Sequence, residues 1–384
     1  MDDAELEGET VLLRTDLNLP VEDGEPQKTV RFERYVETIE ELMDRGARTA
    51  VVAHQGRPAR KDFLSLEKHA ELLSETLGSD VKFVQSFFGP ELGDAVASMD
   101  DGDVVMLENV RFLSEELQNI SPERHSRDHF VQNMARYFDI YVNDAFSAAH
   151  RSHGSLVGFT PLLESYAGPV MKRELDNCGS VREEFDNGVL VLGGEKPSDI
   201  IGMMEQMIEG VEKVLLGGIP GELALKIEGH GLGEKGKWIT EKGYDSKREE
   251  LEELLEEYPE KIMLPEDVRT DSGSRPVEEV EGMTWDIGEE TERKYAEEIR
   301  KADQVVMKGP MGAFEDHPQG SKKVVEAISG AEYSVLGGGH TSSLVQRFGY
   351  SLDDFSHVSI AGGAFVRFMS GEELAAVEAL EEFE

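Results

Sequence analysis

The sequence predicts an α/β protein made of two doubly wound, mostly parallel sheets, each Rossmann-like and in its own domain, with a hinge helix between the domains. Three observations lead to this fold class. A length of 384 residues is long for one hydrophobic core. Short apolar runs alternate with amphipathic helical patterns in the first half of the chain, and the same alternation returns in the second half.

The first half alternates strand and helix patterns. Apolar residues at helical spacing predict helices over residues 35–45, 66–77 and 122–137. Short runs rich in Val, Ile and Leu predict strands at residues 10–13, 49–53, 81–84, 104–107 and 140–142. Strands separated by helices pair in parallel, so this half predicts one doubly wound sheet.

The second half repeats the pattern with its own set of strands. These are expected at residues 189–192, 213–216, 261–264, 304–307, 334–336 and 357–360. The last segment, residues 372–383, places apolar residues on one helical stripe beside an acidic face, so it must dock on another part of the protein.

The domain boundaries follow from a helical pattern near the middle of the chain. Residues 170–176 read as a helix that follows Gly168-Pro169, and this helix is the expected connector. We therefore expect a first domain over residues 1–168, an interdomain helix over residues 169–178 and a second domain over residues 179–364.

The charge balance is strongly acidic. Asp and Glu number 79 against 39 Lys and Arg, which gives a net charge of −40 spread along the chain. Such a field repels nucleic acid, so a nucleic-acid partner is not expected. An acidic surface repels itself at low salt and is screened in molar salt, where the Debye length falls to about 3 Å. We expect a halophilic protein, with an ordinary acidic mesophilic enzyme as the alternative.

Several other classes of protein and site are not expected. No apolar run is long enough to cross a bilayer, and residues 1–5 lack the basic and apolar parts of a secretion signal, so a cytoplasmic protein is expected. The single cysteine, Cys178, cannot form an internal disulfide and is interpreted as a bystander. His150 and His153 suggest a metal pair, but their loop fits anion binding better.

Arginine follows several strands of the first half. Arg57, Arg111 and Arg151 each come shortly after a predicted strand, and Arg31 follows a hairpin-like loop. Ligands of parallel α/β sheets bind beyond the carboxyl ends of the strands. A cluster of arginines at that edge of an acidic protein predicts a small, multiply charged anion as ligand, although any one of them alone would be an ordinary surface residue.

Glycine follows the strands of the second half instead. Gly193-Gly194, Gly217-Gly218, Lys308-Gly309 and Gly337-Gly338-Gly339 come directly after predicted strands. Glycines let backbone N–H groups approach phosphates closely, so this edge predicts a nucleotide site, although tight turns would explain any single pair. The chain has neither a Gly-x-Gly-x-x-Gly after the first strand nor a Walker A motif, which disfavours dinucleotide dehydrogenases and P-loop ATPases.

The same segments of the first half resemble phosphoglycerate kinase motifs, in order and at similar spacing. They are Arg14-Thr-Asp-Leu-Asn-Leu-Pro20, Ala53-His-Gln-Gly-Arg-Pro58, Leu107-Glu-Asn-Val-Arg-Phe112 and Asn143-Asp-Ala-Phe-Ser-Ala-Ala-His-Arg151. The resemblance implies that Arg31 faces the transferring phosphoryl group as a catalytic residue. It also implies a phosphoglycerate site made by Asp16, Asn18, Arg31, His54, Gln55, Gly56, Arg57, Arg111 and Arg151.

Segments of the second half resemble the nucleotide-side motifs of that family. They are Leu192-Gly-Gly-Glu-Lys196, Gly309-Pro-Met-Gly-Ala-Phe-Glu315, Gly337-Gly-Gly-His-Thr341 and residues 355–364. By this resemblance Lys196 is catalytic and holds nucleotide phosphates, Glu315 holds the ribose, and residues 337–341 bind the phosphate tail. The implied nucleotide site is Gly193, Gly194, Lys196, Gly217, Glu315, Gly337, Gly338, Gly339, His340 and Thr341.

The chain departs from the common bacterial and eukaryotic pattern at two positions. Ile200 stands where that pattern has a second lysine, and His340 stands where it has an aspartate near the metal-nucleotide. Archaeal members resemble this chain at both positions, so we expect variation between lineages. The protein residues of a metal site stay unassigned, and Mg²⁺ is expected to be held mainly by nucleotide phosphates and water.

The resemblance implies a complete reaction. An acyl phosphate moves reversibly from 1,3-bisphosphoglycerate to ADP, giving 3-phosphoglycerate and ATP, with Mg²⁺ carried by the nucleotide. The family also implies a monomer, hinge closure and a C-terminal tail, residues 365–384, that returns to the first domain. Two alternatives stay open: a non-catalytic relative that lost turnover through Ile200 and His340, and an NAD-dependent dehydrogenase of similar two-lobed shape.

Overall fold

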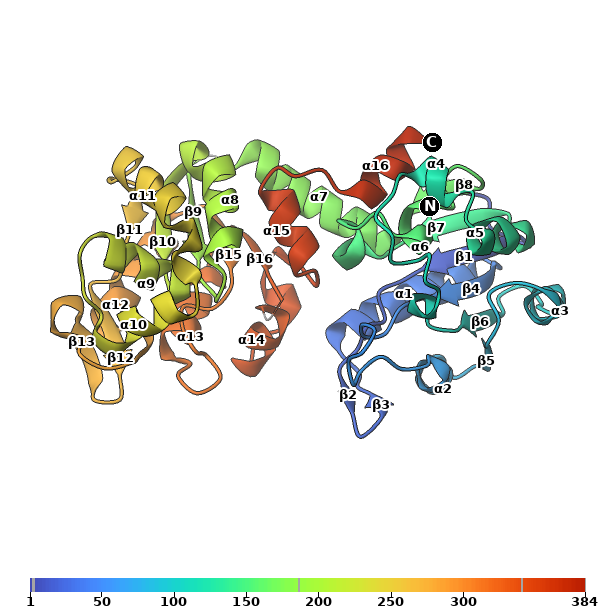
Figure 1. The fold of residues 1–384 in the computed structure, drawn as a ribbon, viewed down its shortest axis with the longest axis horizontal. Helices are drawn as coiled ribbons and strands as arrows, with labels where there is room; N and C mark the ends of the chain where they lie inside the picture. The colour runs from blue at the N-terminus through green and yellow to red at the C-terminus, as the bar shows by residue number, and fades with distance from the viewer. Residues whose placement is uncertain (2–3, 186, 340, 384) are drawn as a thin grey trace. The chain divides into compact units, whose positions relative to one another are not determined.

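The computed structural model describes residues 1, 4–185, 187–339 and 341–383, and these residues form two compact units. The first unit comprises residues 1–176 and 373–384, and the second comprises residues 177–372. Both ends of the chain therefore belong to the first unit (Figure 1). No helix among the described residues has the length and apolar character needed to cross a bilayer.

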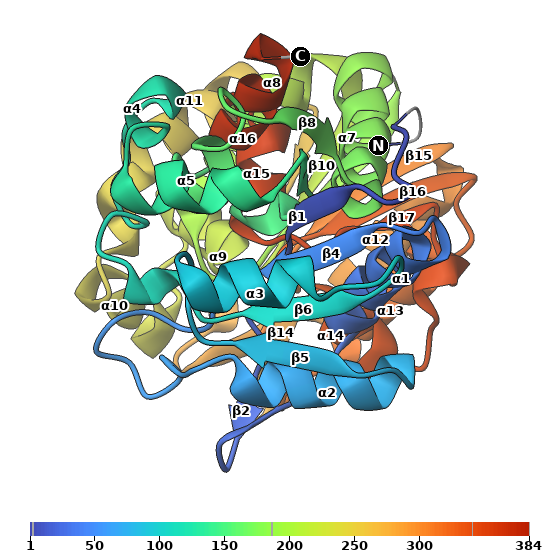
Figure 2. The same cartoon turned by 90° about the vertical axis from the view of Figure 1, so that its right-hand side faces the viewer.

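The first unit is built on a six-stranded, all-parallel sheet in the order β5-β6-β4-β1-β7-β8. Figure 2 shows β1, β4, β6 and β5 as neighbouring arrows of one twisted layer. Its strands are β1 (Thr10–Arg14), β4 (Arg48–Val52), β5 (Val81–Val84), β6 (Val104–Leu107), β7 (Ile140–Asn143) and β8 (Glu164–Ala167). The chain order changes direction at β1, which pairs with β4 on one side and β7 on the other, so a ligand crevice is expected there.

The second unit has its own six-stranded, all-parallel sheet, in the order β11-β10-β9-β15-β16-β17. Its switch point lies at β9, between β10 and β15. The strands are β9 (Gly188–Leu192), β10 (Val211–Leu216), β11 (Ile262–Met263), β15 (Gln304–Lys308), β16 (Tyr333–Gly337) and β17 (His357–Val358). The two sheets confirm the predicted fold class of paired, doubly wound parallel-sheet domains.

The helices follow the predicted alternation. In the first unit these are α1 (Val30–Asp44), α2 (Glu67–Leu77), α3 (Pro90–Ala97), α4 (Pro122–His125), α5 (His129–Met134), α6 (Gly154–Val157) and α16 (Ala375–Glu382). The helix α7 (Pro169–Glu184) contains the boundary between the units. In the second unit they are α8 (Pro197–Met207), α9 (Gly218–Ile227), α10 (Gly233–Glu241), α11 (Arg248–Glu257), α12 (Glu289–Lys301), α13 (Gln319–Ile328), α14 (Thr341–Arg347) and α15 (Gly363–Met369).

Several elements carry too little apolar signal to be predicted. The edge strand β8 is partly exposed and reads Glu-Ser-Tyr-Ala. A hairpin is formed by β2 (Val21–Glu22) and β3 (Glu25–Pro26), and an antiparallel sheet by β12 (Asp267–Thr270), β13 (Gly273–Pro276) and β14 (Thr284–Ile287). Short 3-10 turns lie at Val110–Phe112, Ala135–Tyr137, Phe146–Ala148, Ile208–Gly210, Tyr244–Lys247, Val277–Glu279 and Leu352–Asp354.

The helix predicted over residues 122–137 is wrong as a single helix. The chain there forms α4, α5 and a 3-10 turn, with a break at residues 126–128. At the break Asp128 adopts extended backbone angles, and its carboxylate lies 2.6 Å from Nδ1 of the fully buried His125. Side-chain bonds of this kind compete with helical hydrogen bonding, which periodicity alone does not reveal.

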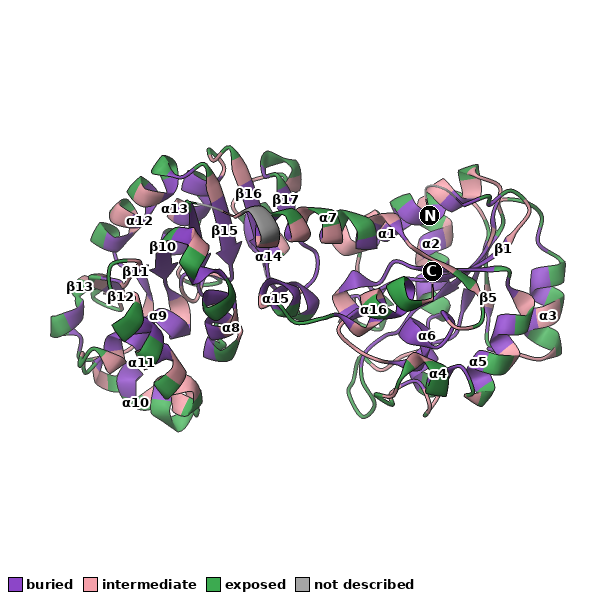
Figure 3. Ribbon diagram, turned by 90° about the horizontal axis from the view of Figure 1, so that it is seen from above, coloured by how far each residue is buried: buried purple, intermediate pink, exposed green. Residues whose placement is uncertain are grey.

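Each unit has its own core around its sheet. Figure 3 colours the central strands of the second sheet, among them β10 and β15, as buried. In the first unit, side chains such as Leu12, Phe130 and Tyr141 are fully buried between the sheet and its helices. Each sheet is therefore held by packing within its own unit, which gives the strand ends a rigid support.

The C-terminal segment docks on the first unit. Its helix α16 contacts α6 and β8, and the amide of Ala376 donates to the carbonyl of Ala149 at 2.9 Å. Leu374 and Leu380 are buried there. The segment that joins the first unit begins at residue 373, whereas residues 365–372 cluster with the second unit.

Candidate active site

The carboxyl edge of the first sheet carries a cavity of about 300 Å³. The residues that follow β1, β4, β6 and β7 all end at this edge because the strands are parallel. Arginine is the commonest side chain in the lining, which consists of Asn18, His54, Gly56, Arg57, Arg60, Asp62, Arg111 and Arg151. The structure therefore brings six of the predicted substrate residues into one concave, basic site.

A buried arginine orients the histidine of this site. Arg14, the last residue of β1, is 1% exposed, and its Nε donates to Oγ of Ser155 at 2.8 Å. Its Nη2 lies 3.0 Å from Nδ1 of His54, so Nδ1 accepts and Nε2 carries the hydrogen. Burial lowers the pKa of His54 well below its usual value, which Asp16 opposes and neighbouring guanidinium groups reinforce. His54 is therefore a neutral donor beside the cavity.

Asp16 links the loop after β1 to α1. Its carboxylate accepts from the amide of Asn18 at 3.2 Å, from Nη1 of Arg31 at 3.3 Å and from the hydroxyl of Ser147. Burial alone would raise the pKa of Asp16, but the charge of Arg31, the hydrogen bond from Ser147 and the charge of Arg14 outweigh it and hold that pKa well below the usual range. Asp16 is thus ionised, and Arg31 is partly exposed with its guanidinium fixed in direction.

Arg111 and Gly56 form the wall of the cavity together. Arg111 donates from Nη1 to the carbonyl of Gly56, whose left-handed backbone has a φ of 64°. A Cβ at Gly56 would lie 2.3 Å from the carbonyl oxygen of Asp62, so only glycine fits. Burial, with Arg151 and Arg14 nearby, lowers the pKa of Arg111 to about 10, which leaves it charged at neutral pH. The wall is permanently cationic.

Gln55 does not belong to the cavity lining. Its side-chain oxygen accepts from the amide of Leu19 at 2.9 Å and lies 3.1 Å from Nε2 of His69, while its Nε2 donates to the carbonyl of Leu19 at 3.0 Å. The residue is fully buried. Gln55 therefore holds the loop after β4 in place rather than offering its amide to a ligand.

Sequence reasoning left several residues of this site out of the predicted set. Arg14 opens a quoted motif, but only the fold shows that it orients His54. Arg60 and Asp62 line the cavity from a loop beyond the strand end, where the rule about strand ends does not reach. Ser147 lies within the last quoted motif, and its partner Asp16 is 131 residues away in the chain.

The glycine turns of the second unit are packed tightly against one another. A Cβ at Gly193 would lie 2.2 Å from the carbonyl oxygen of Pro310, and one at Gly217 would lie 2.7 Å from Sδ of Met311. The amides of these turns donate within the protein: Gly193 to Lys308, Gly194 to Pro310, Gly217 to Leu192 and Gly218 to Met311. Glycine is required here by close packing of the turns, and these four amides are already hydrogen-bonded.

The remaining predicted nucleotide residues lie on or beside the same edge of the second sheet. Lys196 precedes α8 and is exposed, as is Glu315 after β15. Gly337 ends β16, and Thr341 begins α14 with its hydroxyl donating to the carbonyl of Gly337 at 2.7 Å. Gly338 and Gly339 lie between them. His340 lies outside the described residues.

Close to these turns is a partly buried ion pair that sequence reasoning did not single out. Nζ of Lys308, at the end of β15, lies 3.3 Å from Oδ2 of Asp199 in the first turn of α8. Lys308 directly precedes the quoted motif that begins at Gly309, and that position was the available signal. Its partner is 109 residues earlier in the chain.

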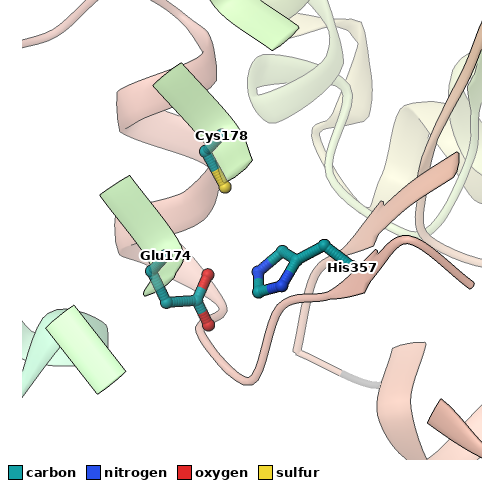
Figure 4. Close-up of side chains that lie close together, drawn as sticks. All are labelled: Glu174, Cys178 and His357. Carbon is teal, nitrogen blue, oxygen red and sulfur yellow. The ribbon is translucent and has the colours of Figure 1, made fainter. Parts of the chain in front are cut away.

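Cys178 is fully buried on α7 and forms no disulfide. Its Sγ lies within 4.8 Å of a ring nitrogen of His357 on β17, in the same unit. Figure 4 shows both side chains, with Glu174 one turn earlier on α7. All three side chains interact with other groups of the protein. A buried thiol among such neighbours is part of the packing around the helix.

The buried His69 gives a pH prediction. Burial lowers its pKa to about 4, whereas an unfolded histidine has a pKa of about 6.5. Between these values the unfolded state binds a proton that the folded state does not, so stability is lost as the pH falls. The wild type should lose about 1.4 kcal/mol of unfolding free energy per pH unit more than His69→Gln across this window.

Urea unfolding of both proteins between pH 7 and 4.5, at one salt concentration, measures this difference. Groups that titrate in both proteins, such as Asp144 with its pKa raised by burial to about 6, cancel in the comparison. The exposed His129→Gln serves as the control, and its stability curve should run parallel to the wild type. Parallel curves for His69→Gln as well would contradict the prediction.

Comparisons with known proteins agree with one another. The family model described as phosphoglycerate kinase matches residues 1–372. The chain is 45% identical to phosphoglycerate kinase of Halorubrum lacusprofundi, over 97% of this chain and 95% of the relative. It is 43% identical to that of Haloarcula marismortui, over 98% of this chain and 97% of the relative.

A solved structure extends the agreement to the fold. The crystal structure of phosphoglycerate kinase from Pyrococcus horikoshii OT3 matches with a TM-score of 0.93 and 33% identity, covering 100% of this chain and 98% of that chain. The match spans both units, with the basic cavity in one and the glycine turns in the other. The chain therefore belongs to the phosphoglycerate kinase family.

Proposed function

We propose that the basic cavity of the first unit binds 3-phosphoglycerate or 1,3-bisphosphoglycerate, and that the glycine-rich edge of the second unit binds ADP or ATP. The enzyme is a kinase with a carboxyl group as phosphoryl acceptor, and its reaction belongs to glycolysis. The proposal concerns which residues carry out that reaction. Membership of this kinase family argues against the two alternatives, an NAD-dependent dehydrogenase and a non-catalytic binding protein.

The observation that carries the proposal is the composition of the cavity. Arg57, Arg111 and Arg151 line about 300 Å³ in a chain whose net charge is −40. Phosphoglycerate offers a phosphate and a carboxylate, and guanidinium groups bind both through paired N–H donors. His54, neutral and with Nε2 carrying its hydrogen, adds a donor without further charge. The site is matched to a small molecule with several negative charges.

The reaction needs no general base in either direction. A terminal phosphate oxygen of ADP attacks the phosphorus of the acyl phosphate, a new P–O bond forms, and the bond to the carboxyl oxygen breaks. The carboxylate leaves with the electron pair, and no proton moves. Catalysis therefore depends on positioning and on neutralising charge on the phosphoryl oxygens. We assign that role to Arg31, which Asp16 holds at 3.3 Å, and to the exposed Lys196.

Magnesium enters as part of the nucleotide substrate in this proposal. Mg²⁺ dehydrates reluctantly and is bound in such sites by substrate phosphates and a few carboxylates. At the glycine-rich edge the carboxylate of Asp199 already pairs with Lys308 at 3.3 Å, so we propose that nucleotide phosphates and water supply most of the Mg²⁺ ligands. Bound Mg²⁺ would neutralise phosphate charge, while Lys196 and Arg31 orient the reacting groups.

We further propose a cytoplasmic monomer with a salt-dependent fold. Self-repulsion of a −40 surface weakens in molar salt because the Debye length falls to about 3 Å. Relatives from salt-loving archaea match over nearly the whole chain. The acidic surface then keeps the enzyme soluble where salt screens its charge.

Substitution in the cavity should separate binding from turnover. Arg57→Met removes an exposed cavity cation and should raise the KM for 3-phosphoglycerate about 10- to 100-fold, with little change in the KM for ATP. Arg31→Ala should instead lower kcat about 100-fold, because its charge acts on the transferring group. Steady-state kinetics at molar KCl measure both effects.

Arg34→Met is the matched control, since Arg34 lies on α1 beside Arg31 and pairs with Glu37 outside the cavity lining. Its kinetic constants should stay within about twofold of the wild type. Unchanged KM values in Arg57→Met would remove the cavity from substrate binding, and unchanged kcat in Arg31→Ala would remove Arg31 from the chemistry.

The activity of the enzyme should depend on salt concentration. In a coupled assay of 3-phosphoglycerate phosphorylation by Mg-ATP, activity and melting temperature should both rise steeply between about 0.1 and 2 M KCl, as screening of surface charge increases. A potassium salt and a sodium salt at equal ionic strength separate screening from specific cation binding. Full activity and unchanged melting temperature at low salt would contradict the halophilic assignment.

Direct transfer requires the two substrates to meet, so we propose that α7 acts as the hinge of a closing motion. Adding both 3-phosphoglycerate and a non-hydrolysable ATP analogue should lower the radius of gyration measured by small-angle X-ray scattering. Either ligand alone should have a smaller effect. A radius that both ligands together leave unchanged would argue against hinge closure.

A further inference from the structure

Lys308 occupies an unusual place for a lysine. It ends β15, the central strand that pairs with β9 and β16, and it is 6% exposed. Its Nζ lies 3.7 Å from where a Cβ of Gly194 would stand, and its Cγ lies 3.9 Å from the corresponding position at Gly338. The side chain therefore runs between the glycine turns that follow β9 and β16.

The ammonium group is only partly satisfied by the protein. Asp199 accepts one of its three N–H donors, at 3.3 Å, and no other acceptor contacts Nζ among the residues that the structure describes. Burial lowers the pKa of Lys308, Asp199 opposes this, and the nearby Lys196 adds to it. Lys308 and Lys196 thus place two positive charges at this edge of the sheet, and the two N–H donors of Lys308 that Asp199 does not use favour an anionic ligand.

The helix that follows Lys196 supplies no second cation. Ile200, four residues after Lys196, is fully buried and apolar, and α8 carries neither Lys nor Arg. Asp199, the acidic partner of Lys308, directly precedes the apolar Ile200 in α8. A positive charge absent from the helix is present on the strand that faces it.

We propose that Lys308 is a catalytic cation of the nucleotide site, which binds the transferring phosphoryl group together with Lys196 and supplies the charge that Ile200 does not provide. The inference rests on the proposed nucleotide site. Two donors of Nζ can reach phosphate oxygens while Asp199 keeps the third. Lys308 would then bind more strongly as negative charge builds up on those oxygens in the transition state.

A structural ion pair is the competing explanation. In that case Lys308 and Asp199 would only fasten α8 to β15, and removal of either partner would destabilise the unit to a similar extent. Two variants distinguish the explanations. Lys308→Gln keeps a donor toward Asp199 and removes the charge. Asp199→Asn keeps the cation and weakens the pair.

Kinetics at molar KCl provide the test, with melting temperature as the check on folding. Lys308→Gln should lower kcat about 100- to 1,000-fold, the effect of deleting one transition-state donor, and leave the KM for 3-phosphoglycerate unchanged. The Kd for ADP, from isothermal titration calorimetry, should rise less than tenfold. Asp199→Asn should keep kcat within about tenfold of the wild type, because the cation remains.

Two results would overturn the proposal: a kcat in folded Lys308→Gln within tenfold of the wild type, or an equal loss of kcat in both variants. Lys323→Gln, which removes a partly exposed lysine on α13 that pairs with Glu326, controls for loss of one positive charge and should match the wild type. Wild-type inactivity would instead challenge the proposed function, and the ADP titration would still show whether Lys308 contacts the nucleotide.

Discussion

Parallel strand pairing is the constraint on which both candidate sites depend. In each unit six parallel strands bring their carboxyl ends to one edge, so residues far apart in the chain meet there. Arg14 ends β1, His54 follows β4 and Arg111 follows β6, yet the three lie in one small region of space. Antiparallel pairing would send alternate strand ends to opposite edges and divide the cluster.

The two edges use the same architecture for different chemistry. The first collects charge: buried Arg14 orients a neutral His54, and an ionised Asp16 fixes Arg31 while the cavity stays cationic. The second collects glycine, which lets the turns after β9, β10 and β15 pack directly on one another. That packing leaves little room for side chains, so the few cations there, Lys196 and Lys308, stand out in an acidic protein.

Prediction from the sequence succeeded for elements with a regular apolar pattern and failed where a single tertiary contact determines the local structure. Regular apolar runs identified the central strands of both sheets, while the partly exposed edge strand β8 carried no such signal. Periodicity predicted one helix over residues 122–137. In the structure the helix is interrupted where the carboxylate of Asp128 contacts His125. Gln55 sat in a binding motif, yet its amide is occupied by Leu19 and His69, which no local pattern shows.

The sequence by itself determined the class of fold, the acidic surface and the difference between arginine-rich strand ends in the first half and glycine-rich ones in the second. Periodicity, composition and motif order are properties of the chain that need no tertiary contact. Only the tertiary structure decided which polar groups already have hydrogen-bond partners within the protein and which can bind a ligand. Backbone amides of the glycine turns proved to be bonded inside the protein, while Lys308 proved to be buried beside Asp199, 109 residues away. Burial and hydrogen-bond partners depend on contacts between distant segments, and such contacts exist only once the chain has folded.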